Sequence, residues 1–137
     1  LGRIQKRAEE KRIAFRIEMP QKVSCPHDAN WLGEAIDNVL DNAVKYSQIS
    51  GTIEMIVQEN EMCAKIVVKD NGLGIAKGEE HKIFQRFYRG KKVTTQKGYG
   101  IGLYLARKIV SLHGGFIIAK SRYPENGLMI EINLPVC

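Results

Sequence analysis

Two asparagines one helical turn apart stand out in the stretch "GEAIDNVLDNAVKYS", which runs from Gly33 to Ser47. Apolar residues recur in pairs every four residues, which predicts a helix lying on a core. The pairs are Trp31/Leu32, Ala35/Ile36, Val39/Leu40 and Ala43/Val44. The same spacing stacks Asn38 and Asn42 on a second face of the helix. Asparagine is roughly 0.5 kcal/mol worse than alanine in a helix, so two stacked amides indicate a role other than helix stability.

A carboxylate and two glycines follow the apolar segment "KIVVKD". The motif "DNGLGI", Asp70 to Ile75, begins with Asp-Asn-Gly, which by itself is a strong hairpin signal. The residues that follow, "AKGEEHKIF", are polar and then helical, which argues against a hairpin. An aspartate at a strand end suits recognition of a purine amino group, because Gly72 and Gly74 let a planar ring approach the backbone.

Three glycines, Gly98, Gly100 and Gly102, open a later helix in "KGYGIGLYLARKIV". Backbone N–H groups at such a helix start point toward an anion, and the helix dipole favours negative charge there. A dinucleotide fingerprint would need a strand just before the glycines and a different spacing, and no P-loop motif occurs in the chain. The glycines therefore indicate either an anion-binding loop or a plain flexible loop.

The alternation of apolar and polar residues predicts the elements that position these residues. Helices are expected over 3–12, from a cap at Asp28 or Asn30 to residue 47, over 81–88 and over 101–113, the last stopped by Gly114 and Gly115. Strands are expected over 13–19, 52–59, 63–70, 116–121 and 127–135, and the first of them should be half-buried. The second and third strands should form one pair, and the last two should form another. The expected fold is α/β, a two-layer sandwich in which one mixed, mostly antiparallel sheet of about five strands is covered by three helices.

Composition limits the class of protein. The 137 residues suffice for one domain with its own core. The three cysteines are odd in number and form no Cys-x-x-Cys pattern, which predicts neither a disulfide framework nor a zinc site and favours a reducing compartment. No apolar run approaches the roughly 18 residues of a membrane span. The net charge of +6 permits a polyanionic partner, but no nucleic-acid-binding signature accompanies it, so nucleic acid is only a weak alternative and is not the expected partner.

Four motifs occur in the order and spacing of one family. "NVLDNAVKYS" resembles the N box, "DNGLGI" the G1 box, "IFQRFYRG" the F box and "GYGIGL" the G2 box of sensor histidine kinases. Together with "HGG" before a strand and the ending "INLP", the resemblance covers essentially the whole chain. The chain thus resembles the catalytic, ATP-binding domain of a two-component histidine kinase, in the superfamily of gyrase and the heat-shock chaperone ATPases. The resemblance implies a Bergerat-type ATP-binding fold with ATP and Mg²⁺ as cofactors.

The resemblance also implies a role for each matching residue. Asn42 would supply its side-chain oxygen to Mg²⁺, a hard cation that takes oxygen ligands, and Asn38 would lie beside the same metal and phosphates. Lys45 would reach phosphate, and Arg89 would pair with the γ-phosphate. The catalytic set implied is therefore Asn38, Asn42 and Arg89, with Asn42 as the metal ligand.

For the base, the resemblance implies that Asp70 binds the adenine amino group and that Tyr46 lies against the ring. Residues 91–99 would form a mobile lid. The full set implied for ATP binding is Asn38, Asn42, Lys45, Tyr46, Asp70, Gly72, Gly74, Ile75, Phe87, Tyr88, Arg89, Lys97, Gly98, Tyr99, Gly100, Ile101, Gly102 and Leu103. One position departs from the family, which often carries a threonine that assists adenine recognition where this chain has Leu128.

Asn38 separates two functions within the superfamily. Gyrase-like hydrolases and anti-sigma-factor serine kinases carry a glutamate at this place as a general base, and an amide cannot accept a proton at neutral pH. The resemblance therefore favours a protein histidine kinase, with the serine kinase as the alternative. The γ-phosphate would pass to a histidine on a separate dimerisation domain and then to a response regulator, because His27, His81 and His113 all lack the neighbours of a phospho-acceptor.

The domain organisation expected from the resemblance has two parts. Residues 1–12 would be the tail of a helix leading out of the dimerisation domain, and residues 13–137 would be the catalytic domain. The parent protein is expected to be a homodimer in a bacterial cell membrane, with this domain on the cytoplasmic side.

Overall fold

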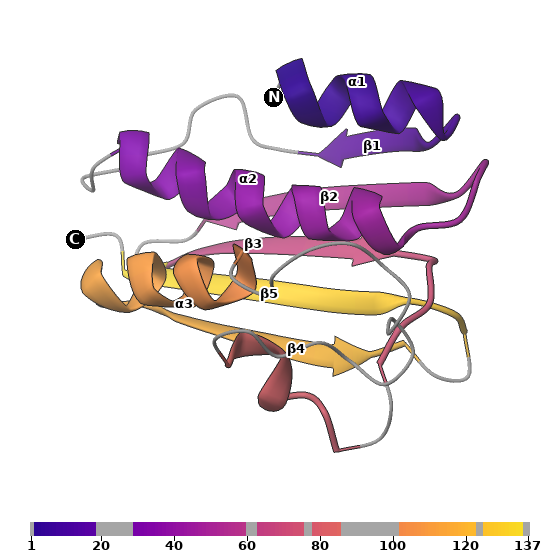
Figure 1. Ribbon diagram of the computed structural model, residues 1–137. Helices are drawn as coiled ribbons and strands as arrows, with labels where there is room; N and C mark the ends of the chain where they lie inside the picture. The colour runs from indigo at the N-terminus through magenta and orange to yellow at the C-terminus, as the bar shows by residue number, and fades with distance from the viewer. Residues whose placement is uncertain are drawn as a thin grey trace.

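The computed structural model describes residues 2–18, 29–59, 63–75, 78–85, 102–122 and 125–135. Figure 1 shows one sheet with the helices on a single face of it. The elements in chain order are α1 (Gly2–Glu10), β1 (Ala14–Glu18), α2 (Ala29–Tyr46), β2 (Thr52–Glu59), β3 (Cys63–Asp70), the 3-10 helix η1 (Lys82–Phe84), α3 (Gly102–Leu112), β4 (Phe116–Ser121) and β5 (Leu128–Pro135). The predicted α/β sandwich is confirmed.

The sheet has five strands in the order β1-β2-β3-β5-β4. Strand β1 runs parallel to β2, and the other three pairs are antiparallel, as the expected mixed sheet requires. Because β3 and β5 pair antiparallel, the end of β3 lies beside the start of β5, where Lys69 pairs with Met129. Asp70 is therefore next to the first residues of β5.

The core lies between the sheet and the helices. Strands β3 and β5 alternate strictly between buried and half-buried residues, as the period of two predicted. Val39 and Val44 of α2, Val110 of α3 and Ile132 of β5 are each at most 1% exposed. Burying an aliphatic side chain of this kind stabilises the fold by roughly 1.5–3 kcal/mol.

Two apolar positions differ from expectation. Trp31 shares the periodicity of the core face of α2, but its side chain is 58% exposed, because it stands in the first turn of the helix. Strand β1 was predicted to be half-buried, yet Ile17 is 52% exposed. The reason is that β1 is an edge strand with a single neighbour, β2.

The helix expected over 81–88 is described only as η1, and residues 86–88 lie outside the described residues.

Both α1 and α3 end in the same backbone motif. In α3, Gly115 N–H donates to the Val110 carbonyl at 3.0 Å and Gly114 has φ +80°, so the predicted glycine stop is confirmed. In α1, Ile13 N–H donates to the Ala8 carbonyl at 2.9 Å and Arg12 takes the left-handed place with φ 56°. Ala8 and Ile13 are both buried, which supplies the apolar contact that accompanies this motif.

Candidate functional site

Asn38 of α2 lies beside the start of α3. Asn38 and Asn42 are both half-buried, and a Cβ added at Gly102, the first residue of α3, would lie 3.8 Å from Asn38 Oδ1. Among the described residues, the Asn38 side-chain nitrogen is buried and has no hydrogen-bond partner. An unpartnered buried N–H group is costly, roughly 1–3 kcal/mol, so its presence beside a glycine-led helix start points to a ligand acceptor.

Asp70 is a buried carboxylate held by backbone donors. Its side chain ends β3 and the residue is 5% exposed. Its Oδ1 accepts from the N–H groups of Gly72 at 2.9 Å and Leu128 at 3.2 Å. No hydrogen bond of a described residue reaches Oδ2. One oxygen of the carboxylate is thus fixed by the protein, which leaves the other as an oriented acceptor.

The charge state of Asp70 results from opposing effects. Burial raises the pKa of the Asp70 carboxyl, whereas the two backbone hydrogen bonds and the positive charge of Arg122 lower it. Arg122 also donates from Nη1 to the Asp70 backbone carbonyl at 2.6 Å. Burial is the largest of these effects, so the pKa of the carboxyl lies above its ordinary value, while the two backbone donors fix the position of Oδ1.

The glycines of "DNGLGI" allow close approach of backbone to backbone. A Cβ at Gly72 would lie 2.2 Å from the Tyr46 carbonyl oxygen, and Leu73 N–H donates to that same oxygen at 3.2 Å. Gly74 has φ +70° and its missing Cβ would face the Gly127 carbonyl at 3.0 Å. Gly72 therefore packs the loop against the end of α2, a different use of the missing side chain from the predicted approach of a planar ring.

Sequence reasoning missed two residues around Asp70. Gly127 lies so close that a Cβ there would be 1.9 Å from the Asp70 carbonyl oxygen, and its φ is +114°. Arg122 contacts the same carbonyl. Neither has a motif of its own: Arg122 follows the strand expected over 116–121, Gly127 begins the strand expected over 127–135, and nothing in the sequence indicated that the turn between these strands lies beside Asp70.

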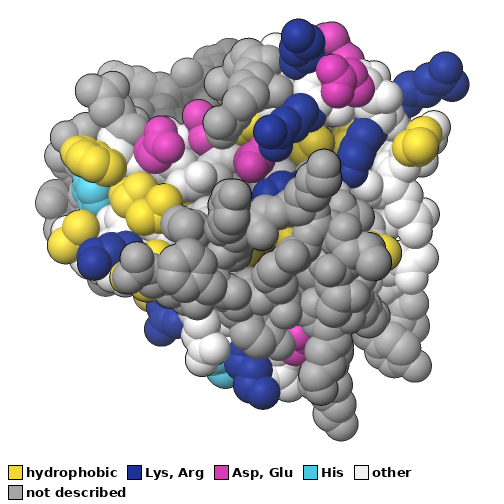
Figure 2. Space-filling model, in the orientation of Figure 1, with side chains coloured by type: hydrophobic (Ala, Val, Ile, Leu, Met, Phe, Trp, Pro, Cys, Tyr) yellow, Lys and Arg dark blue, Asp and Glu magenta, His cyan; other side chains and the backbone are white. Residues whose placement is uncertain are grey.

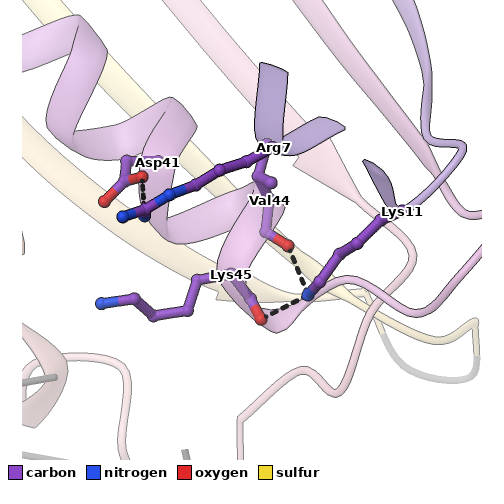
Figure 3. A network of polar contacts seen from close by, with 5 residues as sticks. All are labelled: Arg7, Lys11, Asp41, Val44 and Lys45. Atoms are coloured by element: carbon purple, nitrogen blue, oxygen red, sulfur yellow. Dashed lines mark hydrogen bonds and ion pairs between the residues drawn. The ribbon is translucent and has the colours of Figure 1, made fainter. Parts of the chain in front are cut away.

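Of the other predicted site residues, some are described by the structure and some are not. Lys45, Tyr46 and Ile75 are half-buried, and Leu103 is buried in the core. In Figure 3 the Lys45 side chain extends away from α1. The remaining predicted residues lie outside the described residues, so their places stay predictions, as does the lid over 91–99: Phe87, Tyr88, Arg89, Lys97, Gly98, Tyr99, Gly100 and Ile101.

Charged side chains on the face seen in Figure 2 are of both signs. Lys and Arg side chains alternate with Asp and Glu over the top of that view, where α1 and α2 lie in Figure 1. Within the described residues, no helix combines the length and apolar character needed to cross a membrane.

Residues 27–137 match the model of the histidine kinase-, DNA gyrase B- and HSP90-like ATPases. This chain belongs to that family. It is 37% identical over 132 residues to sensor histidine kinase WalK of Bacillus subtilis, with 93% of this chain and 21% of WalK covered. It is 33% identical over 131 residues to sensor protein CiaH of Streptococcus pneumoniae, with 94% of this chain and 29% of CiaH covered.

Solved structures give the same result. A mycobacterial sensor histidine kinase, MprB, superimposes with a TM-score of 0.80 and 31% identity, covering 96% of this chain and 92% of that chain. The catalytic domain of histidine kinase ThkA superimposes with a TM-score of 0.84 and 25% identity, covering 98% and 88%. Within its family the chain is therefore an ATPase-type catalytic domain of the sensor histidine kinases, and it spans about a fifth to a third of the length of the curated relatives it matches. These relatives give no support to the serine kinase alternative.

Proposed function

We propose that this domain binds ATP beside α2, the loop after β3 and the start of α3, and donates the γ-phosphate to a histidine on a separate dimerisation domain. The observation that carries the proposal is Asp70, a buried carboxylate with Oδ1 held by two backbone donors and Oδ2 left as an acceptor. Adenine carries an amino group that donates to such an acceptor, whereas guanine has a carbonyl at the corresponding place and is repelled. The domain should therefore select ATP over GTP.

The phosphates are assigned to the asparagine face. Magnesium takes oxygen ligands and neutralises phosphate charge, and the donor set fits it, because Asn42 offers an amide oxygen on the same face as the unpartnered Asn38 nitrogen. Asn38 donates its buried N–H to a phosphate oxygen, which removes the cost of leaving that donor unpaired. Lys45 and Arg89 add positive charge toward the phosphates.

The chain has no general base at the place where hydrolases of the superfamily carry one, because Asn38 occupies it. An imidazole acceptor is itself a nucleophile, so a kinase of this class needs from its ATP domain only binding and orientation of the γ-phosphate. The proposed partners are accordingly a histidine-bearing dimerisation domain of the parent protein, a second copy of that parent, and a response regulator. The parent is proposed to lie in the cell membrane, with residues 1–12 leading in from the dimerisation domain.

Transfer of labelled phosphate tests this function. The chain incubated alone with γ-labelled ATP and Mg²⁺ should acquire no acid-labile phosphate, because the acceptor must be held in line with the bound phosphate. Adding the parent's histidine-bearing domain should produce acid-labile, alkali-stable label on that domain. An Asn42→Ala chain serves as the negative control. Stoichiometric self-labelling of His27, His81 or His113 in the isolated chain would contradict the proposal.

A further inference from the structure

Lys11, which follows the last residue of α1, caps the C-terminal end of α2, the helix that carries Asn38 and Asn42. The Lys11 ammonium donates to the carbonyl oxygens of Val44 at 2.9 Å, Lys45 at 2.8 Å and Ser47 at 3.0 Å. Figure 3 shows the ammonium reaching the Val44 and Lys45 carbonyls while the Lys45 side chain extends in another direction. The last carbonyls of a helix lack partners within it and carry partial negative charge, so the ammonium both satisfies and neutralises the end of α2.

The remaining carbonyl of this helix end, that of Tyr46, is bound by the loop that follows Asp70. Among residues 44–47, Lys11 contacts every carbonyl except that of Tyr46, which accepts from Leu73 N–H at 3.2 Å. The preceding residue, Gly72, packs on the same carbonyl oxygen and donates its own N–H to Asp70 Oδ1 at 2.9 Å. Lys11 and the Asp70 loop thus hold adjacent carbonyls of one helix end.

Lys11 is itself fixed in place. Its backbone carbonyl accepts from Ser50 N–H at 2.8 Å, and the residue after it, Arg12, is set by the motif that ends α1. An ammonium has three N–H donors, and here all three are used. Burial lowers the pKa of the Lys11 ammonium, while the carbonyl oxygens favour its charged form. The contact is therefore a fixed joint between α1 and α2 rather than a solvated surface charge.

We propose that Lys11 is a positioning residue for nucleotide binding, which holds the end of α2 so that Tyr46 and Leu73 keep the Asp70 loop in its binding geometry. This inference rests on the proposed function. Two simpler roles compete with it. Lys11 could stabilise the fold without affecting the site, or its charge could attract the nucleotide from a distance.

Lys11→Met keeps the apolar stem and removes all three donors, so it is the main test variant. At a temperature where the protein is fully folded, its affinity for Mg-ATP should fall by about two- to thirtyfold, the range expected for a residue that acts through others. In the nucleotide-free protein, the Leu73 amide should exchange its hydrogen faster than in the native chain. Lys11→Arg keeps the charge, but its planar fork cannot converge on three carbonyls, so its affinity should lie between the two.

Two controls separate the competing roles. Ile117→Val removes a buried methyl from β4, and it should lower the melting temperature while leaving ATP affinity native. Arg7→Gln removes a cation of the same helix, which pairs with Asp41 at 2.8 Å and is half exposed, and it should also leave ATP affinity native. An equal loss of affinity in Ile117→Val would reduce Lys11 to a stabiliser, and an equal loss in Arg7→Gln would reduce it to a source of charge. Either result overturns the proposal.

The native chain distinguishes failure of this inference from failure of the proposed function. If native protein does not bind ATP, the proposed function fails, and exchange of the Leu73 amide still tests the joint. If native protein binds ATP and Lys11→Met binds it equally well with unchanged Leu73 exchange, the inference alone fails. Should Lys11→Met not fold, Lys11→Arg carries the test, and native affinity in that variant would overturn the proposal.

Discussion

Among the described residues, Asp70 Oδ2 and Asn38 Nδ2 of the candidate site have no hydrogen-bond partner and can pair with a ligand. Asp70 Oδ2 is left over after Oδ1 accepts two backbone N–H groups. Within the described part of the chain, Asn38 Nδ2 is the buried side-chain donor without an acceptor. Such atoms are costly in an empty domain and favourable in a loaded one, since a ligand that pairs with them removes the penalty. Substitutions at the ligand-binding side chains should therefore weaken nucleotide binding without lowering the stability of the fold.

Asn42→Ala should abolish the part of ATP affinity that depends on Mg²⁺ and leave the fold intact. Asn42 is half-buried on a polar helix face, and alanine is the better helix former by roughly 0.5 kcal/mol, so the melting temperature should stay the same or rise. Calorimetric titration with ATP, with and without Mg²⁺, measures the effect. The matched control is Glu34→Ala, two helical turns earlier on the same face and exposed, which should bind ATP normally. Unchanged Mg-dependent affinity in Asn42→Ala would remove Asn42 from the metal site.

The ratio of ATP to GTP affinity should depend on the charge of Asp70. Because burial raises the pKa of this carboxyl, its charge is lost on acidification at a pH above the ordinary range for aspartate. Because Oδ1 accepts two N–H groups, the proton is taken up by Oδ2, which then donates instead of accepting, so the preference for ATP should fall as the pH is lowered through that pKa. Both nucleotides carry the same phosphates, so the titration of the phosphates cancels in the ratio. A ratio that stays constant on acidification, while the protein remains folded, would contradict the role of Asp70.

At the scale of elements, the residue that follows each helix decides how much backbone strain the helix end carries. Both α1 and α3 end with a residue in the left-handed conformation, but α3 uses Gly114 and α1 uses Arg12. A residue other than glycine pays roughly 1–2 kcal/mol there, partly offset by the higher chain entropy of glycine in the unfolded state. The same motif thus stores strain at one helix end and not at the other.

Arg12→Gly should stabilise the domain by up to about 1 kcal/mol, a rise of a few degrees in melting temperature, because it relieves the left-handed strain without removing a buried contact. Gly114→Ala is the reciprocal variant. It should destabilise by a similar amount, since the new Cβ would meet only the Pro135 ring at an ordinary 3.5 Å and the cost is conformational. Thermal unfolding of both variants checks the pair. A lower melting temperature for Arg12→Gly would show that its side chain has a stabilising contact.

For the whole molecule, the sequence patterns predicted which face of each strand is buried better than they predicted which strands lie side by side. Alternation located all five strands of the described sheet, because a half-buried strand reveals its buried face by a period of two. The pairs formed by strands that follow each other in the chain, β2 with β3 and β4 with β5, were predicted and are confirmed, but the full order β1-β2-β3-β5-β4 was not, since periodicity does not show which of these pairs lie side by side. Asp70 was found from its motif, but the Leu128 N–H that holds it is a backbone group from the other end of the chain. Such a contact is visible only in the folded protein.

The pairing of β3 with β5 thus brings the Leu128 N–H to Asp70, the residue proposed to bind adenine. Leu128 replaces a threonine that the family often carries, yet its N–H donates to Asp70 Oδ1 whatever the side chain. The departure from the family pattern therefore leaves the orientation of the carboxylate intact. Selectivity for adenine should be retained on this account, and it should depend on Asp70 itself.

Calorimetric titration of the native chain and of Asp70→Asn with Mg-ATP and Mg-GTP tests this account most directly. Asparagine keeps Oδ1 as an acceptor for Gly72 and Leu128 but places a donor where Oδ2 was, so the variant should stay folded. The native chain should bind ATP strongly in preference to GTP. The variant should lose about tenfold to a hundredfold in ATP affinity, corresponding to roughly 1.5–3 kcal/mol for a buried charged hydrogen bond, and with it the preference. Equal binding of ATP and GTP by the native chain, or an undiminished preference for ATP in folded Asp70→Asn, would contradict the account.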